Sequence, residues 1–224
     1  AKPLEIKNLF KRTIDTGIQH GTVTVMQDKE GFEVTTYRID GEYEDSRHPK
    51  EVTFTSNLRE DLRRRDFTIN AMAYNDEVGL VDIFEGISDI EKKVIRCVGD
   101  AKERFTEDAL RMMRAVRFSA QLGYSIEENT QKAIKELAPT LQKISAERIQ
   151  VELVKLVTSK NPDYLRIAYE TGITKVIFPE FDLCMNTEQN NPHHIYTVGE
   201  HTLQSMKYDE KEKSVICIVS TCVC

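Results

Sequence analysis

The hydrophobic pattern of this chain changes from strand-like to helical near residue 95, and this change constrains the fold more than any other feature. Residues 21–27 and 32–38 alternate apolar and polar side chains as strands do, and turn-forming residues between them indicate a β-hairpin. From Thr106 onward, apolar residues recur with the period of a helix. We therefore predict an α+β fold, in which a mixed β-sheet with helices is followed by an all-helical part.

Shorter patterns predict the remaining elements. We predict helices over residues 4–10, 57–65, 67–74, 127–137 and 146–158, a helix that opens at residues 161–162, and short strands over 78–84 and 94–98. Residues 40–52 are polar and contain Gly41 and Pro49, which is typical of a loop. Another helix is predicted to have Thr106 as its N-cap and to end at Gly123, with Glu107 and Asp108 in its first turn.

The composition excludes several classes of protein. The net charge of -6 argues against a surface that coats nucleic acid everywhere, although a local basic groove is compatible with it. No apolar run is long enough to span a bilayer, and the first residues do not form a signal peptide. The five cysteines are odd in number and lack paired zinc-ligand spacing, so we expect a reduced, cytoplasmic protein without membrane attachment.

The first of two arginine-rich runs places Arg64, Arg65 and Asp66 directly before the apolar residues 67–73. Guanidinium groups bind phosphates through paired hydrogen bonds. Burying an Arg beside an Asp is tolerable only when their hydrogen bonds are complete, and a nucleotide's phosphates and ribose hydroxyls could complete them. The run therefore indicates a nucleotide pocket, although basic triplets also occur on solvated helix faces.

The second run covers residues 107–118, and on a helix it would present two different faces. Its buried face would hold Ala109, Met112, Met113, Val116 and Ala120. Arg111, Arg114 and Arg117 fall on the opposite side at steps of three residues, led by Asp108. Three like charges at this spacing repel one another unless an anion lies among them. The spacing supports two interpretations equally: an Asp108–Arg111 surface pair with two solvated arginines, or a site for a triphosphate or RNA backbone.

These segments resemble the bacterial CCA-adding tRNA nucleotidyltransferases, a class that also contains bacterial poly(A) polymerases. Besides the two arginine-rich runs, the resemblance is carried by residues 19–23, 32–38, 40–49 and 145–149, and it extends to about Tyr208. It implies a partial nucleotidyltransferase head over residues 1–95 and a helical neck over residues 96–160 that selects the nucleotide and binds tRNA. Residues 161–224 would begin a helical body.

The resemblance also implies roles for individual residues. Those that would hold the incoming nucleotide are Arg65, Asp108, Arg111, Arg114 and Arg117. Among them, Asp108 and Arg111 would read the base edge, whereas Asp66 and Asn70 would lie on the ribose side. Glu33 fits the hydrophobic–acid–hydrophobic pattern of the fold's third catalytic carboxylate, although strand alternation alone makes it an exposed residue.

The expected cofactor of this family is Mg²⁺, held by an Asp-x-Asp pair. No such pair occurs in residues 1–35, so we expect that this chain does not polymerise alone. Residues 191–203 resemble the start of an HD-type body segment with His201 at its first metal-ligand position, but the His-Asp pair that should follow is missing, and we assign no metal there. Residues 214–224 are uncharged and Cys-rich, and we interpret them as the product of a truncation or an altered reading frame.

The resemblance leaves alternative functions open. The first hypothesis is CCA addition to the tRNA 3′ end from CTP and ATP, because residues 40–49 match a loop that members adding CCA need for the switch from C to A. The closest alternatives are a poly(A) polymerase and an A-adding enzyme. A non-catalytic RNA- or nucleotide-binding module is a second hypothesis, and an HD-type phosphohydrolase remnant is disfavoured by the missing His-Asp pair.

Overall fold

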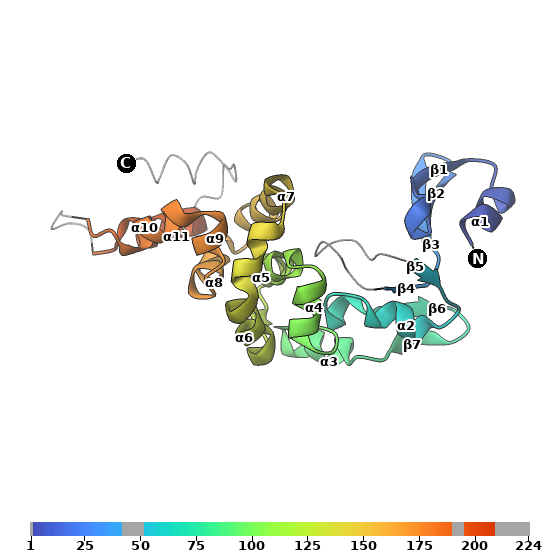
Figure 1. The fold of residues 1–224 in the computed structure, drawn as a ribbon, viewed down its shortest axis with the longest axis horizontal. Helices are drawn as coiled ribbons and strands as arrows, with labels where there is room; N and C mark the ends of the chain where they lie inside the picture. Colours follow the sequence, from blue (N-terminus) through green and yellow to red (C-terminus); the bar gives the residue numbers. More distant parts are fainter. Residues whose placement is uncertain (1, 42–51, 190–194, 209–224) are drawn as a thin grey trace. The chain divides into compact units, whose positions relative to one another are not determined.

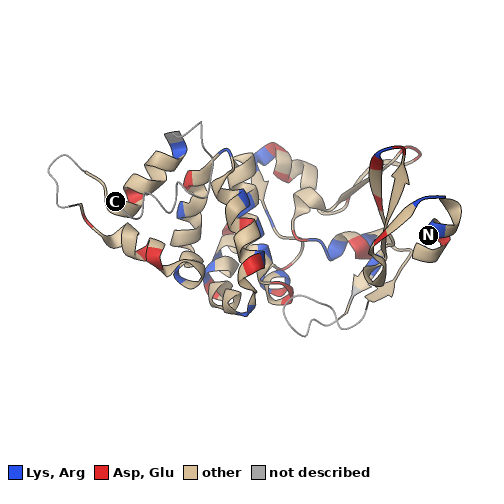
Figure 2. Cartoon of the chain, turned by 90° about the horizontal axis from the view of Figure 1, so that it is seen from above, with Lys and Arg blue, Asp and Glu red and all other residues tan. Residues whose placement is uncertain are grey.

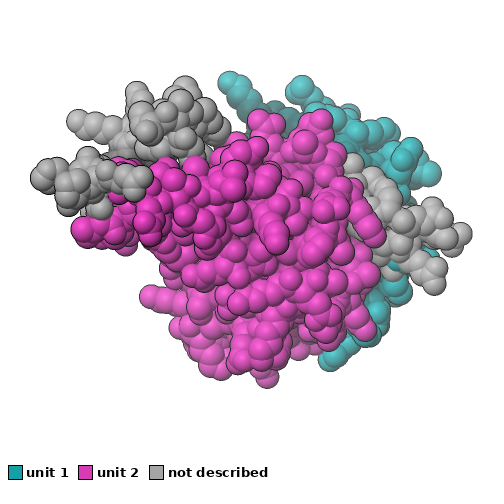
Figure 3. Space-filling model, turned by 60° about the vertical axis from the view of Figure 1, so that its left-hand side comes forward, with its two compact units in different colours: residues 1–44, 48–65 teal, residues 45–47, 66–224 magenta. Residues whose placement is uncertain are grey.

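The computed structural model describes residues 2–41, 52–189 and 195–208, and the chain forms two compact units. The first unit comprises residues 1–44 and 48–65, and the second comprises residues 45–47 and 66–224 (Figure 3). The α+β class is confirmed, with small sheets in both units and most helices in the second. The compact units divide after Arg65, whereas the three domains bounded at residues 95 and 160 stay a prediction. Most of the predicted loop over 40–52, and all of residues 214–224, lie outside the described residues.

The largest sheet of the first unit is three-stranded and antiparallel (Figure 1). Its order is β1 (Thr13–Gly17), β2 (Thr22–Gln27) and β3 (Glu30–Thr35), and the predicted hairpin is confirmed as β2 and β3. Asp28 takes a left-handed conformation with φ 55°, which closes the two-residue turn between these strands. The helix α1 (Pro3–Leu9) packs on β2, where Ile6, Val23 and Val25 form a small buried core.

The rest of the first unit consists of short elements. They are η1 (Ile18–His20), the antiparallel pair β4 (Arg38–Asp40) and β5 (Val52–Phe54), and α2 (Leu58–Arg63). Asn57 caps α2, because its side-chain oxygen accepts a 3.0 Å hydrogen bond from the backbone N–H of Arg59. The predicted helix over residues 57–65 is therefore confirmed in all but its end residues.

The helix predicted over residues 67–74 is wrong. The chain forms the short η2 (Thr68–Asn70) and then the hairpin of β6 (Met72–Asn75) and β7 (Gly79–Asp82). The backbone N–H of Thr68 bonds to the carbonyl of Arg96 at 3.0 Å, and Phe67 forms an antiparallel bridge to Cys97. These long-range partners take the backbone groups that a helix would need, so tertiary pairing overrides the local apolar pattern.

The longest described helix of the second unit is α5 (Leu110–Leu122), which lies among α4, α7 and α8 (Figure 1). The other elements are α3 (Gly86–Lys92), β8 (Val94–Ile95), α4 (Ala101–Glu107), β9 (Ser125–Ile126), α6 (Glu128–Leu137), η3 (Ala138–Lys143), α7 (Ala146–Val157), η4 (Pro162–Tyr164), α8 (Leu165–Glu170), α9 (Thr174–Ile177), α10 (Pro179–Asn186) and α11 (Val198–Tyr208). The face of α5 predicted to be buried is confirmed, and α4, α7 and α8 pack on this helix. No helix within the described residues combines the length and apolar character that crossing a membrane requires.

The start of α5 differs from the prediction. Thr106 lies inside α4, where its hydroxyl donates to the carbonyl of Lys102, and Asp100 caps α4 instead. Asp108 occupies an extended residue between the two helices, with φ -143°, and its carboxylate accepts from the backbone N–H of Leu110. Gly123 ends α5 as predicted, in a left-handed conformation with φ 71°. The helix break places the Asp108 side chain at the beginning of α5 rather than along its surface.

Candidate functional site

Each of the three arginines spaced along α5 is paired with a carboxylate from a different part of the second unit. Arg111 binds Glu107 at the end of α4, and the shortest nitrogen–oxygen distance is 2.6 Å. Arg114 binds Asp66 and Arg117 binds Glu152 on α7, both at 2.6 Å. Lys and Arg side chains and Asp and Glu side chains are interspersed over the helices of the second unit (Figure 2). The expected repulsion is therefore relieved by the protein's own carboxylates.

Asp66 is a nearly buried hub that joins three groups. Its Oδ1 accepts hydrogen bonds from the backbone N–H of Phe67 at 2.9 Å and from the Asn70 amide at 3.2 Å. Its Oδ2 accepts two bonds from Arg114, at 2.9 Å from Nε and 2.6 Å from Nη2. The structure thus brings Arg114 to Asp66 and Asn70, although Arg114 lies more than forty residues later in the sequence.

Asp108 has a partner that the sequence did not identify. Its Oδ2 accepts a 3.0 Å hydrogen bond from Nη2 of Arg148 on α7, and its Oδ1 accepts from the backbone N–H of Leu110 at 3.1 Å. The proposed Asp108–Arg111 surface pair is therefore not the pair that forms. Arg148 lies in the segment 145–149 that carried part of the family resemblance, and this was the only signal for it. Two fixed contacts hold the Asp108 carboxylate in one orientation.

Arg111 is held from the side of α4. Its Nη1 donates to the Glu107 carboxylate and, at 3.1 Å, to the backbone carbonyl of Arg104. Glu107 also forms an ion pair with Arg104, so one carboxylate binds two guanidinium groups. The Arg111 side chain is only 12% exposed. Its contacts with Glu107 and the Arg104 carbonyl fix the position of its guanidinium group.

Arg117 is buried, which contradicts its predicted place on the side of α5 opposite the core. Its guanidinium lies 3.9 Å from the centre of the Phe118 ring and donates to the Gln121 side chain at 3.0 Å. Burial lowers the pKa of Arg117, and the nearby Glu152 carboxylate opposes that shift. The pair is nearly inaccessible, at 9% and 7% side-chain exposure, because α7 covers this end of α5. Arg117 therefore fixes α7 to α5, and its guanidinium group is too buried to contact a ligand directly.

Arg65 and Glu33 belong to the first unit. Arg65 follows α2 and lies 3.6 Å from the buried carboxylate of Asp61, which also binds Arg64 at 2.8 Å. Glu33 is exposed on β3, in register with Thr24 of β2. The nucleotide and catalytic roles of these two residues stay predictions.

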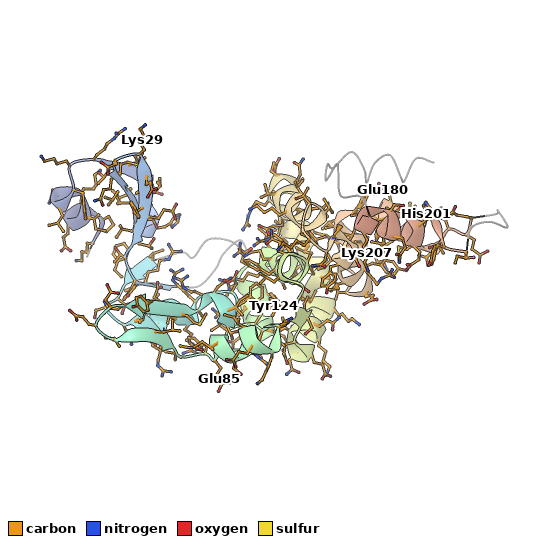
Figure 4. The ribbon with its side chains drawn as sticks, turned by 180° about the vertical axis from the view of Figure 1, so that it is seen from behind. Lys29, Glu85, Tyr124, Glu180, His201 and Lys207 are labelled. Atoms are coloured by element: carbon orange, nitrogen blue, oxygen red, sulfur yellow. The ribbon has the colours of Figure 1, made fainter. Side chains whose placement is uncertain are left out.

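The carboxylates of the described residues do not fit a magnesium site. Within the described ranges, no three His, Cys, Asp or Glu side chains come close enough together to hold a metal ion. Glu33 has no acidic neighbour of that kind, and His201 is exposed on α11 (Figure 4). We therefore derive no chemical step through a metal.

Two family models match the chain. Residues 1–96 match the "Poly A polymerase head domain", and residues 123–185 match the "Probable RNA and SrmB- binding site of polymerase A". The two matched ranges leave out α5, which carries the arginine row.

Curated relatives and solved structures extend the likeness across α5. The CCA-adding enzyme of Leuconostoc mesenteroides is 46% identical over 219 residues, which cover 95% of this chain and 55% of that enzyme. The CCA-adding enzyme of Pediococcus pentosaceus is 57% identical over 163 residues, or 73% of this chain and 41% of that enzyme. The crystal structure of the Bacillus stearothermophilus CCA-adding enzyme in complex with CTP is 42% identical with a TM-score of 0.71, covering 77% of this chain and 42% of that chain. The chain thus spans about half the length of the curated relatives it matches.

Proposed function

The chain belongs to the family of CCA-adding tRNA nucleotidyltransferases and bacterial poly(A) polymerases, and from this premise we propose that it selects the nucleotide for CCA addition to tRNA. Its substrates would be CTP, ATP and the 3′ end of tRNA. The observation that carries the proposal is that a hydrogen-bond acceptor, Asp108, and a donor, Arg111, are both held in fixed orientations at the start of α5. Asp108 is oriented by Arg148, and Arg111 is oriented by Glu107.

The chemistry of this pair suits two of the four bases. Cytosine and adenine each present an amino N–H donor beside a ring nitrogen acceptor, whereas guanine and uracil present a carbonyl acceptor beside a ring N–H donor. An ionised Asp only accepts hydrogen bonds and an Arg only donates them. Asp108 with Arg111 would therefore match C and A, and would leave groups unpaired against G and U. Each unpaired buried group costs about 1–3 kcal/mol, which suffices for selection.

The neighbouring residues suit the rest of a nucleotide. Arg114 offers a guanidinium beside Asp66 and Asn70, so these three residues would meet the ribose and phosphates. Arg65 would add a second guanidinium for the phosphates. Arg117 would act indirectly, by fixing α7 to α5 and so holding Arg148 in place.

The names of the relatives support CCA addition over poly(A) synthesis. Relatives that are 46% and 57% identical carry the name CCA-adding enzyme, and a solved structure at 42% identity binds CTP. Poly(A) synthesis requires ATP alone. We also propose a cytoplasmic location, because tRNA, CTP and ATP are available there.

Mg²⁺ ions are the expected cofactor of the complete family enzyme. The described residues do not provide their site, so we limit the proposal for this chain to selecting the nucleotide and binding RNA. Glu33 remains the candidate for a third catalytic carboxylate on β3.

Calorimetric titration of this chain with each of the four nucleoside triphosphates tests the proposal. CTP and ATP should bind at least tenfold more tightly than GTP and UTP, and Asp108→Ala should remove the difference. Equal binding of all four nucleotides, or binding of none, would refute it. A chimera that places this chain in the Leuconostoc mesenteroides enzyme then separates the activities on tRNA lacking its end: addition of A without C would favour the poly(A) alternative.

A further inference from the structure

A cavity of about 480 Å³ opens at the end of α5 that is remote from Asp108. It lies where α5 ends at Gly123 and the chain enters β9, next to the end of α3 and the start of α8. The side chains that matter here are Lys92, Lys93, Tyr124, Gln131 and Tyr164. Since α5 rises 1.5 Å per residue, about 20 Å of helix separates this cavity from the base-selecting pair. The cavity is therefore a separate site and no extension of the nucleotide pocket.

The two lysines of this cavity carry charges that no described carboxylate neutralises. Neither Lys92 nor Lys93 forms an ion pair with any residue that the structure describes. A second cavity, of about 440 Å³, also contains two lysines, but there Lys102 binds Glu136 at 2.6 Å and Lys132 binds Glu128 at 2.5 Å. The electrostatic difference between the two cavities favours an anionic ligand only in the first.

The position of Lys93 strengthens this interpretation. Its backbone is left-handed, with φ 57°, a conformation that glycine adopts without strain and a lysine does not. A cation near the last turn of α3 is favoured by the helix dipole, and Lys92 alone would supply it. The interaction with the helix dipole therefore does not explain why Lys93 occupies a backbone position that favours glycine.

Aromatic and uncharged polar groups complete the cavity. Tyr124, labelled in Figure 4, is fixed by its backbone, whose N–H and carbonyl both bond to Ser119 across the end of α5. Among the described residues, the phenol groups of Tyr124 and Tyr164 and the amide of Gln131 make no side-chain hydrogen bonds. Tyrosine rings offer stacking surfaces for unpaired bases, and phenols and amides bond to ribose hydroxyls. The groups present match the three parts of a ribonucleotide.

We propose that this cavity binds one unstacked nucleotide of the RNA substrate, with its phosphate at Lys92 and Lys93 and its base against the tyrosines. The volume suits a single nucleotide, and both lysines are exposed, so a continuous strand can enter and leave. All the residues that line the cavity except Lys92 and Lys93 lie in the segment matched by the RNA-binding family model, among them Tyr124, Gln131 and Tyr164. The inference rests on the proposed function, because it assigns a second contact to the same RNA.

Fluorescence anisotropy with a labelled tRNA transcript that lacks its CCA end tests the inference. The double variant Lys92→Gln/Lys93→Gln should bind roughly tenfold more weakly, and the slope of log K against log salt should fall by about 1.5, as expected for two lost phosphate contacts. The matched control Lys102→Gln/Lys132→Gln removes the same charge from the second cavity and should change neither quantity. Equal losses in both double variants, or no loss in the first, would overturn the inference.

Two further variants distinguish a direct effect on RNA binding from misfolding. Their nucleotide binding separates this inference from the proposed function. Lys93→Gly relieves the left-handed strain, so its thermal midpoint should stay within a few degrees of wild type while RNA binding weakens. Tyr124→Leu should weaken RNA binding about fivefold or more through lost stacking. CTP binding should be unchanged in all these variants. If the wild-type chain binds all four nucleotides equally, the proposed function is refuted. If the lysine variants keep the wild-type RNA affinity, only the inference about the cavity is refuted. A wild-type chain that binds no RNA overturns the cavity inference as well.

Discussion

Arg114 donates two hydrogen bonds to one carboxylate oxygen of Asp66, a residue 48 positions earlier in the chain. The remaining oxygen of Asp66 is bonded to Phe67 and Asn70, so the carboxylate is saturated by groups that the fold brings to it. A single ion pair thereby connects the start of the second unit to its central helix.

Replacing Arg114 by Ala should lower the free energy of unfolding by about 1–3 kcal/mol, because it leaves a nearly buried carboxylate oxygen without its charged donor. Arg114→Lys keeps the charge but loses the two-pronged geometry, so its effect should be intermediate. Urea denaturation measures both. Lys135→Ala, at an exposed position of α6, serves as the control and should change stability by less than about 0.5 kcal/mol. An Arg114→Ala variant as stable as this control would contradict the role assigned to the pair.

Glu152→Gln should destabilise the protein by about 3 kcal/mol, because it leaves the Arg117 charge buried without a counterion. Replacing both residues, with Arg117→Met and Glu152→Leu, should recover most of that loss by removing both charges. A double-mutant cycle in urea gives the coupling between them. A coupling near zero would show that the pair does not hold α7 against α5.

Arg148→Ala should reduce discrimination between CTP and UTP by about tenfold while leaving the fold intact, because Asp108 loses the group that orients it. Arg148→Lys should restore part of the selectivity. Glu147→Gln alters the adjacent exposed residue of α7 and should leave the ratio of the two dissociation constants unchanged. Selectivity that survives in Arg148→Ala would mean that Asp108 is oriented by other contacts.

Glu200 makes the stability of α11 dependent on pH. Hydrogen bonds from Arg166 hold the pKa of Glu200 below its ordinary value of 4.5, despite an opposing effect of burial. Since the folded-state pKa is lowered, the stabilisation is complete above pH 4.5 and is lost as the pH falls through the lowered value. Glu200→Gln should therefore cost about 0.5–1 kcal/mol at pH 7 and almost nothing once the pH has fallen below the lowered pKa. Thermal midpoints of both proteins from pH 2 to 7 provide the measurement, and a difference independent of pH would contradict it.

Cys97 should resist alkylation in the folded protein. Burial raises the pKa of its thiol to about 12, and a hydrogen bond with Thr130 offsets only part of that shift. Little thiolate therefore exists at pH 8, whereas the half-buried Cys184 is more accessible. Peptide mass spectrometry after iodoacetamide treatment should find Cys184 labelled before Cys97, and Cys97 labelled only in urea. Equal labelling of the two in the folded protein would show that the region around Cys97 opens readily.

Local patterns were sufficient for elements whose partners are near in sequence. The hairpin of β2 and β3 was predicted from its turn, and the buried face of α5 was predicted from its period. The segment 67–74 was misassigned because its backbone pairs with residues some thirty positions later, and no local pattern encodes that pairing. The strand β1 is an exception: its partner β2 is near in sequence, but a register shift between Ile14 and Gly17 interrupts the pairing, and the strand was missed.

For the candidate site, the sequence identified the arginines but not their counterions. Helical spacing placed Arg111, Arg114 and Arg117 on one side, and only the packing of α7 shows that the third is buried. Arg148 and Glu152 come from an element some thirty residues beyond α5, so their pairing with α5 depends on the tertiary fold. Charge patterns along one helix reveal where a site could lie, but its partners require the fold.

The arginines of α5 are held by three carboxylates, from Glu107 of α4, Glu152 of α7 and Asp66, and this affects the free energy of ligand binding. Side chains that are free in solution lose rotational entropy when they close on a ligand, at about 0.5–1.5 kcal/mol each. Here Arg111, Arg114 and Asp108 are ordered by folding itself. A nucleotide that arrives at the start of α5 would therefore meet a rigid template, and its affinity would depend on the match of its base rather than on the ordering of the protein.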